Sequence, residues 1–346
     1  MGSSQTTNPL AGKRLWTANQ PVSHPERSEP WFEDGNIVIE AGFKQFKVYR
    51  GILAASSEVF RDMFLVPQPI EQGSVDGCPI VHLSDSPDDV RYILDALCNR
   101  RCQNLHLHCD LQSNLAPCCR NYFTDKKPQP FALLAAFVRL GRKYEIHQLR
   151  DEAINRLCRV YPIRLKKWLS MEDKFTHIIP EDTVHLDVIH LAQENDLPYL
   201  LPAAFLLCYD TFTHQQMLEG VHRNDGTLAV LSAEDQRMIT LGWHALIAEQ
   251  FKETYKWMDT AEDEGLFKKC TSPEECNAAR RENYYCTFYP APDLKALDDW
   301  DEDWADELCD SCAAVSIRQH KKGRTNIWNE LPSFFGLPPW AEMLKE

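Results

Sequence analysis

Four cysteines near the C-terminus have the residue type and spacing of a zinc site. Cys309 and Cys312 form a C-x-x-C pair, whose spacing lets two thiolates bind one zinc ion from a tight turn, and Cys270 and Cys276 could supply the other two ligands. Four thiolates around a tetrahedral ion would stabilise a segment that lacks a regular apolar pattern. Cys286 is an alternative ligand, and the other interpretation is that Cys270, Cys276 and Cys286 are ordinary thiols of loops or a core.

The 13 cysteines of the chain are more typical of free thiols and metal ligands than of disulfides. The number is odd, and the polar N-terminus lacks the apolar core of a signal peptide, so we expect an intracellular protein, cytoplasmic or nuclear. Residues 101–120 contain four of these cysteines without any sustained apolar period. We interpret them as an irregular insertion in a surface loop, and the alternative is that they are translated from a retained intron or a mis-set splice boundary.

The sequence contains none of the common catalytic patterns. There is no G-x-S-x-G elbow, P-loop, H-E-x-x-H or G-x-G-x-x-G motif, and single histidines such as His147, His190 and His244 lie within helical patterns. We therefore expect no enzymatic activity, with an enzyme that has an unrecognised site as an alternative.

The charge of the chain disfavours two classes of partner. The net charge is −14, so the sequence lacks the basic surface that a nucleic-acid-binding protein needs and that an anionic membrane attracts. No apolar run approaches the length that a bilayer requires. A basic run from Arg318 to Arg324 leaves open a transcriptional regulator with a zinc-stabilised C-terminal region, but this run follows an acidic block.

The clearest secondary-structure pattern lies near the N-terminus. Residues 46–48 alternate apolar and charged side chains, which predicts a half-buried strand, and residues 37–39 predict the strand before it, with a hairpin turn at Ala41 and Gly42. Apolar residues then recur at helical spacing from 52 to 64. Ser56 and Ser57 interrupt this pattern, where a hydroxyl can cap the second of two short helices.

This arrangement resembles the core of the BTB/POZ domain, a protein–protein interaction module. The matching positions are Phe46, Arg50, Leu53, Ser56, Phe60, Met63 and Phe64. The whole chain is similar to a large group of fungal, basidiomycete-type BTB proteins, which have a helical extension and a C-terminus rich in Cys and Trp. The resemblance implies an α+β fold: a small mixed sheet with helices, then an all-α extension and a small Cys-rich C-terminal region.

The resemblance also implies protein partners. BTB domains commonly self-associate, so we expect a homodimer, and some members recruit cullin-type ubiquitin-ligase scaffolds or co-repressors. We expect Phe43, Arg50, Ile52 and Leu53 to lie on the dimer or partner surface. The leading hypothesis is a protein–protein interaction scaffold, in its most concrete form a substrate adaptor for a ubiquitin ligase.

Two positions depart from the family pattern. Members usually carry an acid where this chain has Asn36 and a His where it has Tyr49. Without that acid, Arg50 loses an expected ion-pair partner, which argues against co-repressor binding.

The predicted organisation has four parts. Residues 1–29 are polar and predicted to be disordered, 30–161 form the BTB/POZ domain with its insertion, 162–259 form the helical extension, and 260–346 form the Cys/Trp-rich region. In this last part an acidic block contains Trp300 and Trp304 at i,i+4 spacing. We expect the two indoles to pack onto the C-terminal region rather than to bind a basic partner.

Overall fold

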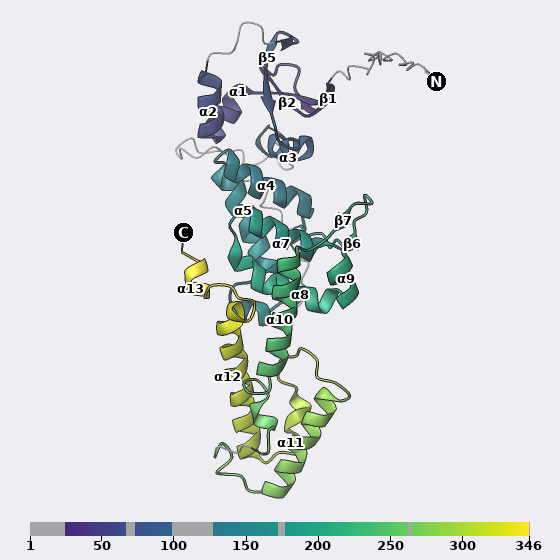
Figure 1. Cartoon of the computed structure of the whole chain (residues 1–346). Helices are drawn as coiled ribbons and strands as arrows, with labels where there is room; N and C mark the ends of the chain where they lie inside the picture. Colours follow the sequence, from purple (N-terminus) through teal and green to yellow (C-terminus); the bar gives the residue numbers. More distant parts are fainter. Residues whose placement is uncertain (1–24, 67–72, 99–126, 172–176, 262–264, 346) are drawn as a thin grey trace, which may run out of the picture.

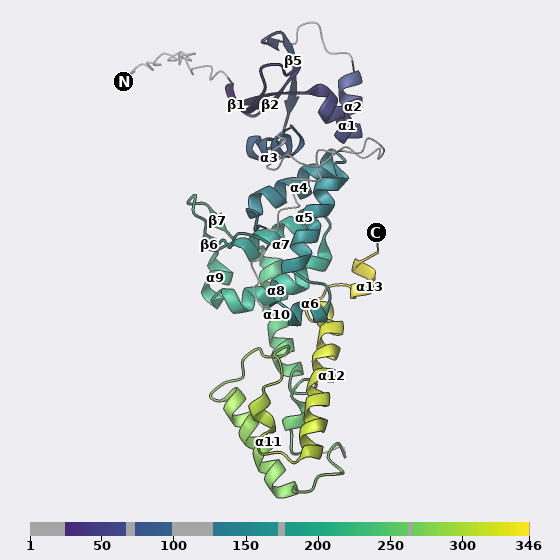
Figure 2. The same ribbon diagram turned by 180° about the vertical axis from the view of Figure 1, so that it is seen from behind.

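The computed structural model describes residues 25–66, 73–98, 127–171, 177–261 and 265–345. The structure belongs to the mixed α+β class, as predicted, with a five-stranded sheet and many helices. Figure 1 and Figure 2 show an elongated molecule: the sheet lies at one end, most helices lie in the middle, and a smaller lobe lies at the other end.

The N-terminal part is built on the sheet. Its elements are β1 (Glu26–Trp31), β2 (Ile37–Ala41), β3 (Lys44–Val48), α1 (Arg50–Ser56), α2 (Glu58–Leu65), β4 (Ser74–Val75), β5 (Cys78–Leu83) and α3 (Pro87–Cys98). The strand order is β1-β3-β2-β5-β4. β2 and β3 form an antiparallel pair with Ile37 opposite Val48, whereas β1 and β5 run parallel to β3 and β2. The predicted turn is present between β2 and β3, where Gly42 has a φ of 55° that favours glycine.

β3 is buried on both faces, which corrects the prediction of a half-buried strand. Phe46 and Val48 are fully buried, but Lys47 is also only 6% exposed. Its ammonium group donates a hydrogen bond to the carbonyl oxygen of Glu33 at 2.8 Å, so the turn before β2 covers this face. Gly35 permits the close approach, because a Cβ at this position would lie 2.9 Å from Cγ of Lys47. The alternating pattern could not reveal a lysine that is satisfied by a backbone carbonyl.

The two short helices α1 and α2 form as predicted. The hydroxyl of Ser57 accepts the backbone N–H of Phe60 at 3.0 Å and caps α2. Phe60 and Phe64 are 1% and 9% exposed, which confirms the predicted buried face. Phe60 stacks on Tyr144 with a centroid distance of 4.5 Å, so α2 is anchored to the C-terminal end of the helix of residues 131–143.

The middle of the molecule consists of helices and one short hairpin. Its elements are α4 (Phe131–Lys143), α5 (His147–Val160), α6 (Leu165–Leu169), α7 (Val184–Glu194), η1 (Pro198–Leu200), α8 (Leu201–Thr211), α9 (His214–Glu219), β6 (Val221–His222), β7 (Leu228–Ala229) and α10 (Ala233–Glu249). The extension was predicted to be all-helical. The structure corrects this prediction, because β6 pairs with β7. The connecting residues Asn224, Asp225 and Gly226, with Gly226 at a φ of 83°, are typical of a hairpin turn.

One hydrophobic core joins the sheet to the middle helices. It includes Phe46 of β3, Phe137 of α4 and Phe205 of α8, all fully buried. Tyr161, at the predicted domain boundary, is also fully buried, and its hydroxyl oxygen lies 2.9 Å from Nδ1 of His185. The boundary between residues 161 and 162 stays a prediction.

The C-terminal part forms a lobe and then returns to the middle of the molecule. Its elements are η2 (Lys256–Met258), α11 (Pro273–Phe288), η3 (Glu302–Ala305), α12 (Asp310–Phe334) and α13 (Trp340–Met343). α12 runs along the lobe and ends against the middle helices, where Phe335 meets Phe205 at a centroid distance of 5.1 Å. Gly323 lets α12 cross closely over the backbone before η2, because a Cβ there would lie 2.3 Å from the carbonyl of Glu253.

The lobe has a second, separate hydrophobic core. Its buried members are Tyr255, Trp257, Met258, Phe267, Cys276, Ala279, Phe288, Leu308 and Cys312. Two of the four candidate zinc ligands thus belong to the packed interior of the lobe.

The structure also corrects the predicted end of the disordered N-terminal segment. β1 begins at Glu26, whereas residues 1–29 were predicted to be disordered. The backbone N–H of Glu26 donates to the carbonyl of Phe43 at 2.7 Å, so pairing with β3 orders a segment that has little apolar pattern. Residues 1–24 and the predicted insertion at 101–120 lie outside the described residues.

Candidate metal centre

Two helix N-termini and one loop position the four cysteines. Cys276 lies in the first turn of α11, Cys309 is the N-cap of α12, and Cys312 lies in the first turn of α12. Cys270 precedes α11 in a tight turn, in which its backbone N–H donates to the carbonyl of Phe267 at 2.9 Å. The segment from 276 to 309 therefore folds back so that α11 and α12 start at the same place.

The four sulfur atoms converge on one point. The Sγ atoms of Cys270, Cys276, Cys309 and Cys312 all lie within 4.8 Å of one another. In a tetrahedral zinc–thiolate site with bonds of about 2.3 Å, the sulfurs lie about 3.8 Å apart. The cluster thus has the donor set and nearly the spacing of a four-thiolate site, which could bind a metal ion.

Hydrogen bonds favour the thiolate form of part of this cluster. The backbone N–H of Cys309 donates to the Sγ of Cys276 at 3.3 Å. Hydrogen bonds from the backbone and side chain of Thr271 lower the pKa of the Cys309 thiol to about 5. Burial raises the pKa of Cys276 and Cys312. The partial positive charge at the starts of α11 and α12 favours negative charge on the sulfurs, and a bound cation would favour it further.

The cluster is closed toward the lobe interior. Cys276 and Cys312 are each 1% exposed, while Cys270 and Cys309 are half-buried. All four positions around a bound ion would be filled by thiolates, which is the arrangement of a structural zinc site and leaves no position for a substrate.

The alternative ligand, Cys286, lies outside the cluster. It sits ten residues after Cys276 on the same helix α11, which places it about 15 Å further along the axis. Its thiol is exposed and donates to the carboxylate of Glu282 at 3.5 Å, which raises its pKa.

The two tryptophans of the acidic block pack onto the lobe, as expected. Trp300 and Trp304 are partly buried against the second core, with their rings 5.1 and 5.7 Å from that of Trp257. They also enclose His320 of α12, which the sequence placed in the basic run from Arg318 to Arg324 but which is fully buried. Its Nε2 lies 3.0 Å from the carbonyl oxygen of Asp298, and burial lowers the pKa of His320 to about 4.

The residues predicted to form a partner surface differ in exposure. Phe43 is 68% exposed at the β2–β3 turn, Arg50 is exposed, and Ile52 is half-buried. Leu53 is fully buried in the main core, which corrects its assignment to the surface. Leu53 belongs to the main core, whereas its neighbours Ile52 and Ala54 are half-buried.

The two departures from the BTB pattern have local structural roles. The side-chain oxygen of Asn36 accepts the backbone N–H of Arg50 at 2.8 Å, at the start of α1. The Arg50 guanidinium donates to the carbonyl of Phe64 at 2.7 Å, and the Tyr49 hydroxyl donates to Asp34 at 2.6 Å. Arg50 therefore ties α1 to the end of α2 instead of pairing with an acid at position 36.

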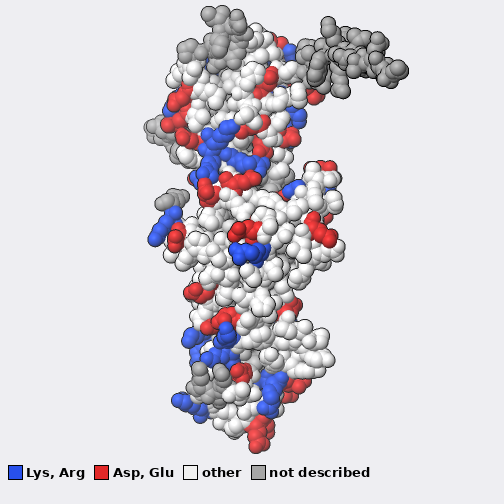
Figure 3. All heavy atoms as spheres, in the orientation of Figure 1, with Lys and Arg blue, Asp and Glu red and all other residues white. Residues whose placement is uncertain are grey.

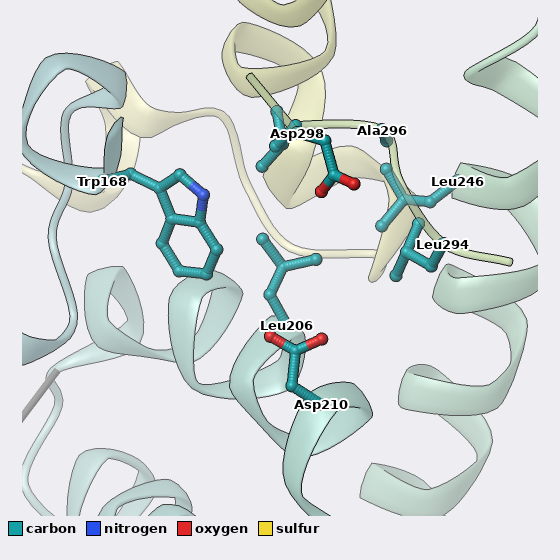
Figure 4. Close-up of a pocket in the computed structure, with 8 residues that line it drawn as sticks. Trp168, Leu206, Asp210, Leu246, Leu294, Ala296 and Asp298 are labelled. Atoms are coloured by element: carbon teal, nitrogen blue, oxygen red, sulfur yellow. The ribbon is translucent and has the colours of Figure 1, made fainter. Parts of the chain in front are cut away.

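A small cavity lies where the segment before η3 crosses α8 and α10. Its volume is about 60 Å³, and Figure 4 shows that Asp210 and Asp298 turn their carboxylates toward it beside Trp168 and Leu206. Partial shielding from solvent, with Asp210 and Asp293 nearby, raises the pKa of Asp298 to about 6. The cavity is too small for a typical small-molecule ligand, which needs about 300 Å³ or more.

Comparisons with protein-family models, with curated proteins and with solved structures found no match to this chain. Within the described residues, no helix combines the length and the apolar character that crossing a bilayer requires.

Proposed function

We propose that this chain is a non-catalytic protein–protein interaction scaffold. In this proposal the N-terminal part is a BTB/POZ-type domain that binds a second copy of the chain or another protein. A structural zinc ion, bound by Cys270, Cys276, Cys309 and Cys312, stabilises the C-terminal lobe. The observation that carries the zinc part of this proposal is the convergence of these four thiols at the starts of α11 and α12.

The geometry supports a structural role for the metal. The four ligands come from three places in the sequence, so one ion would connect the loop at Cys270, α11 and α12. Zinc bound by four thiolates contributes to folding and carries no open coordination position for catalysis. Carboxylates of the acidic block are poorer ligands for zinc than these thiolates.

The BTB/POZ assignment is supported by the order and placement of the N-terminal elements. An antiparallel strand pair is followed by two short helices, a further strand and the helix α3, in the order that the resemblance implies. The positions that carry the resemblance, among them Phe46, Leu53 and Phe60, are buried where such a core needs them.

Self-association is the first test of the scaffold. Phe43 is a large apolar side chain that the fold leaves 68% exposed next to the sheet, so it is the natural anchor for a partner. Light scattering coupled to size-exclusion chromatography of the full chain should give the mass of a dimer at micromolar concentration. Phe43→Glu should convert the dimer to a monomer.

A matched control separates this effect from a general change in surface charge. Leu241 of α10 is 57% exposed, and Figure 1 shows that α10 lies away from the sheet, so Leu241→Glu should leave the dimer intact. A monomeric wild-type chain at these concentrations would contradict self-association.

The identity of the partner is the second test. Affinity purification followed by mass spectrometry should recover a cullin-type scaffold if the chain is a ubiquitin-ligase adaptor. Figure 3 shows acidic and basic side chains interspersed on the face drawn there, without a continuous basic surface. This charge distribution favours protein partners over the alternative of a DNA-binding regulator.

A further inference from the structure

A charged groove lies between α4, the segment before α7 and the turn of the β6–β7 hairpin. Its volume is about 350 Å³, and it is lined by residues that are far apart in the sequence, from Phe131 on α4 to Asp225 in the hairpin turn. This volume is at the lower end of small-molecule sites and is large enough for a long side chain and its neighbours.

The floor of the groove is apolar and has small side chains. Phe131, Ala132 and Ala135 line it from the first two turns of α4, and Ala132 is exposed to solvent. Ala135 is only 1% exposed, so the methyl group of Ala132 is the apolar surface of the floor against which an aliphatic chain can lie.

Both arginines that line the groove are neutralised within the chain. Arg139 donates two hydrogen bonds to Asp89, at 2.9 and 3.1 Å. Arg223 forms an ion pair with Asp187, and Asp187 also accepts the hydroxyl of Thr183 at 2.7 Å. Arg223 also lies close enough to Asp225 to help lower its pKa, so the charge of this guanidinium is shared between two acids of the groove.

Four acids, Glu181, Asp182, Asp187 and Asp225, line the groove, against two arginines. Glu181, Asp182 and Asp225 are exposed, and within the described part of the chain none of them forms an ion pair with a Lys or Arg. Asp225 is held in place by the amide and hydroxyl of Thr227, at 2.9 and 2.6 Å. Partial burial and the nearby Asp187 raise the pKa of Glu181, and the backbone N–H of Phe131 at the start of α4 opposes this rise. The groove therefore has an excess of negative charge at fixed positions.

Apolar side chains are exposed next to these acids in the sequence. Ile179 is 42% exposed two residues before Glu181, and Leu228 is 44% exposed three residues after Asp225. A partner that carries apolar residues beside a positive charge would match both features.

We propose that this groove binds a basic segment of a partner protein. The aliphatic stem of a Lys or Arg lies over Ala132, and its charged end lies among Glu181, Asp182 and Asp225. Charge complementarity makes the occupant cationic, and this excludes nucleic acid. The inference rests on the proposed scaffold function, for which it names the chemistry of one partner.

Fluorescence polarisation of a labelled probe peptide tests the proposal on the full-length chain. The probe is Gly-Leu-Lys-Lys-Leu-Gly, and its counterpart with two glutamates in place of the lysines is the negative control. The lysine peptide should bind and the glutamate peptide should not, and added salt should weaken the binding. Asp182→Asn combined with Asp225→Asn should weaken binding about tenfold, since two partly exposed ion pairs are lost.

Two further variants make the result specific to the groove. Asp151→Asn combined with Glu194→Gln removes the same amount of charge from exposed acids that do not line the groove, and should leave binding unchanged. Ala132→Leu changes no charge but fills the floor, and should weaken binding at unchanged thermal stability.

Absence of binding of the lysine peptide at low salt would overturn the proposal, and so would equal weakening by the two charge-neutralising pairs. The molecular mass and the zinc content of the same samples test the scaffold proposal independently of peptide binding to the groove. Groove binding by a monomeric chain would therefore overturn self-association alone.

Discussion

The backbone N–H of Cys309 donates a hydrogen bond to the Sγ of Cys276 at 3.3 Å, and so joins the N-terminus of α12 to the first turn of α11. A bound zinc ion would reinforce a contact that the two helices already make. α12 continues for 25 residues from this point to the middle helices, so the cluster fixes the outer end of the longest helix in the described structure.

Removal of the metal should loosen the C-terminal lobe and leave the sheet unchanged. The lobe has its own core, and the four cysteines are part of it or pack against it. Hydrogen exchange should show that EDTA lowers amide protection in α11 and in the first turns of α12 but not in β2 and β3. Zinc at 100 times its dissociation constant should restore about 2.7 kcal/mol of stability to the lobe. Loss of protection in the sheet as well would show that the two cores do not respond separately.

Truncation of Phe60 should destabilise the N-terminal part severely. Phe60 is 1% exposed and stacks on Tyr144, so Phe60→Ala should cost about 3–5 kcal/mol of unfolding free energy. Urea denaturation followed by fluorescence or circular dichroism measures this loss. Phe43→Ala, at a site that is 68% exposed, should cost far less; similar values for the two variants would show that α2 does not pack as described.

The two adjacent serines between α1 and α2 should respond differently to alanine. Ser57→Ala removes the acceptor for the Phe60 N–H and the donor to the Tyr144 carbonyl, so a loss of about 1–2 kcal/mol is expected. Ser56→Ala removes only a hydroxyl contact to the Ile52 carbonyl within α1 and should be nearly neutral. The measurement is the free energy of unfolding of both variants; equal losses would argue against the cap.

Histidine 320 should make the stability of the lobe depend on pH. Burial lowers its pKa from 6.5 to about 4, so between these values the unfolded chain binds more protons than the folded one. Stability from this residue is therefore lost as the pH falls from 6.5 to 4. The stability difference between the wild type and His320→Gln should shrink over this range in zinc-saturated samples.

The pKa of Asp298 is raised in the folded chain, so this carboxyl group adds stability to the lobe as the pH falls. Asp298 is present in both proteins, so its contribution cancels when the wild type is compared with His320→Gln. Parallel stability curves for the wild type and His320→Gln would contradict the buried, neutral state of His320.

The candidate metal site could be predicted from the sequence only in part. The Cys309–Cys312 spacing indicated a metal-binding pair, but the choice between Cys276 and Cys286 as a further ligand depended on α11. Once residues 273–288 are known to form one helix, ten residues of separation place these two thiols too far apart for one ion. The apolar residues around Cys276 and Cys286 have only a weak helical period, so the sequence did not predict that one helix contains both thiols.

Other features depend on contacts between distant segments, which a local pattern does not contain. Ile52 and Leu53 are neighbouring apolar residues, and only the tertiary packing of α1 buries Leu53 fully and leaves Ile52 half-buried. The charged groove was not predicted, because Ala132, Asp182 and Asp225 come from three separate segments. By contrast, the Ser57 cap and the buried face of Phe60 and Phe64 follow from spacing within one short stretch, and both are confirmed.

The zinc content of the purified full-length chain is the most direct measurement of the proposed metal centre. After expression with zinc and purification without chelators, elemental analysis should give about one zinc ion per chain. Cys276→Ser should lower this value, whereas Cys286→Ser, which changes an exposed thiol outside the cluster, should retain it. A wild-type chain with no bound zinc and with all 13 thiols open to titration would contradict the proposed site.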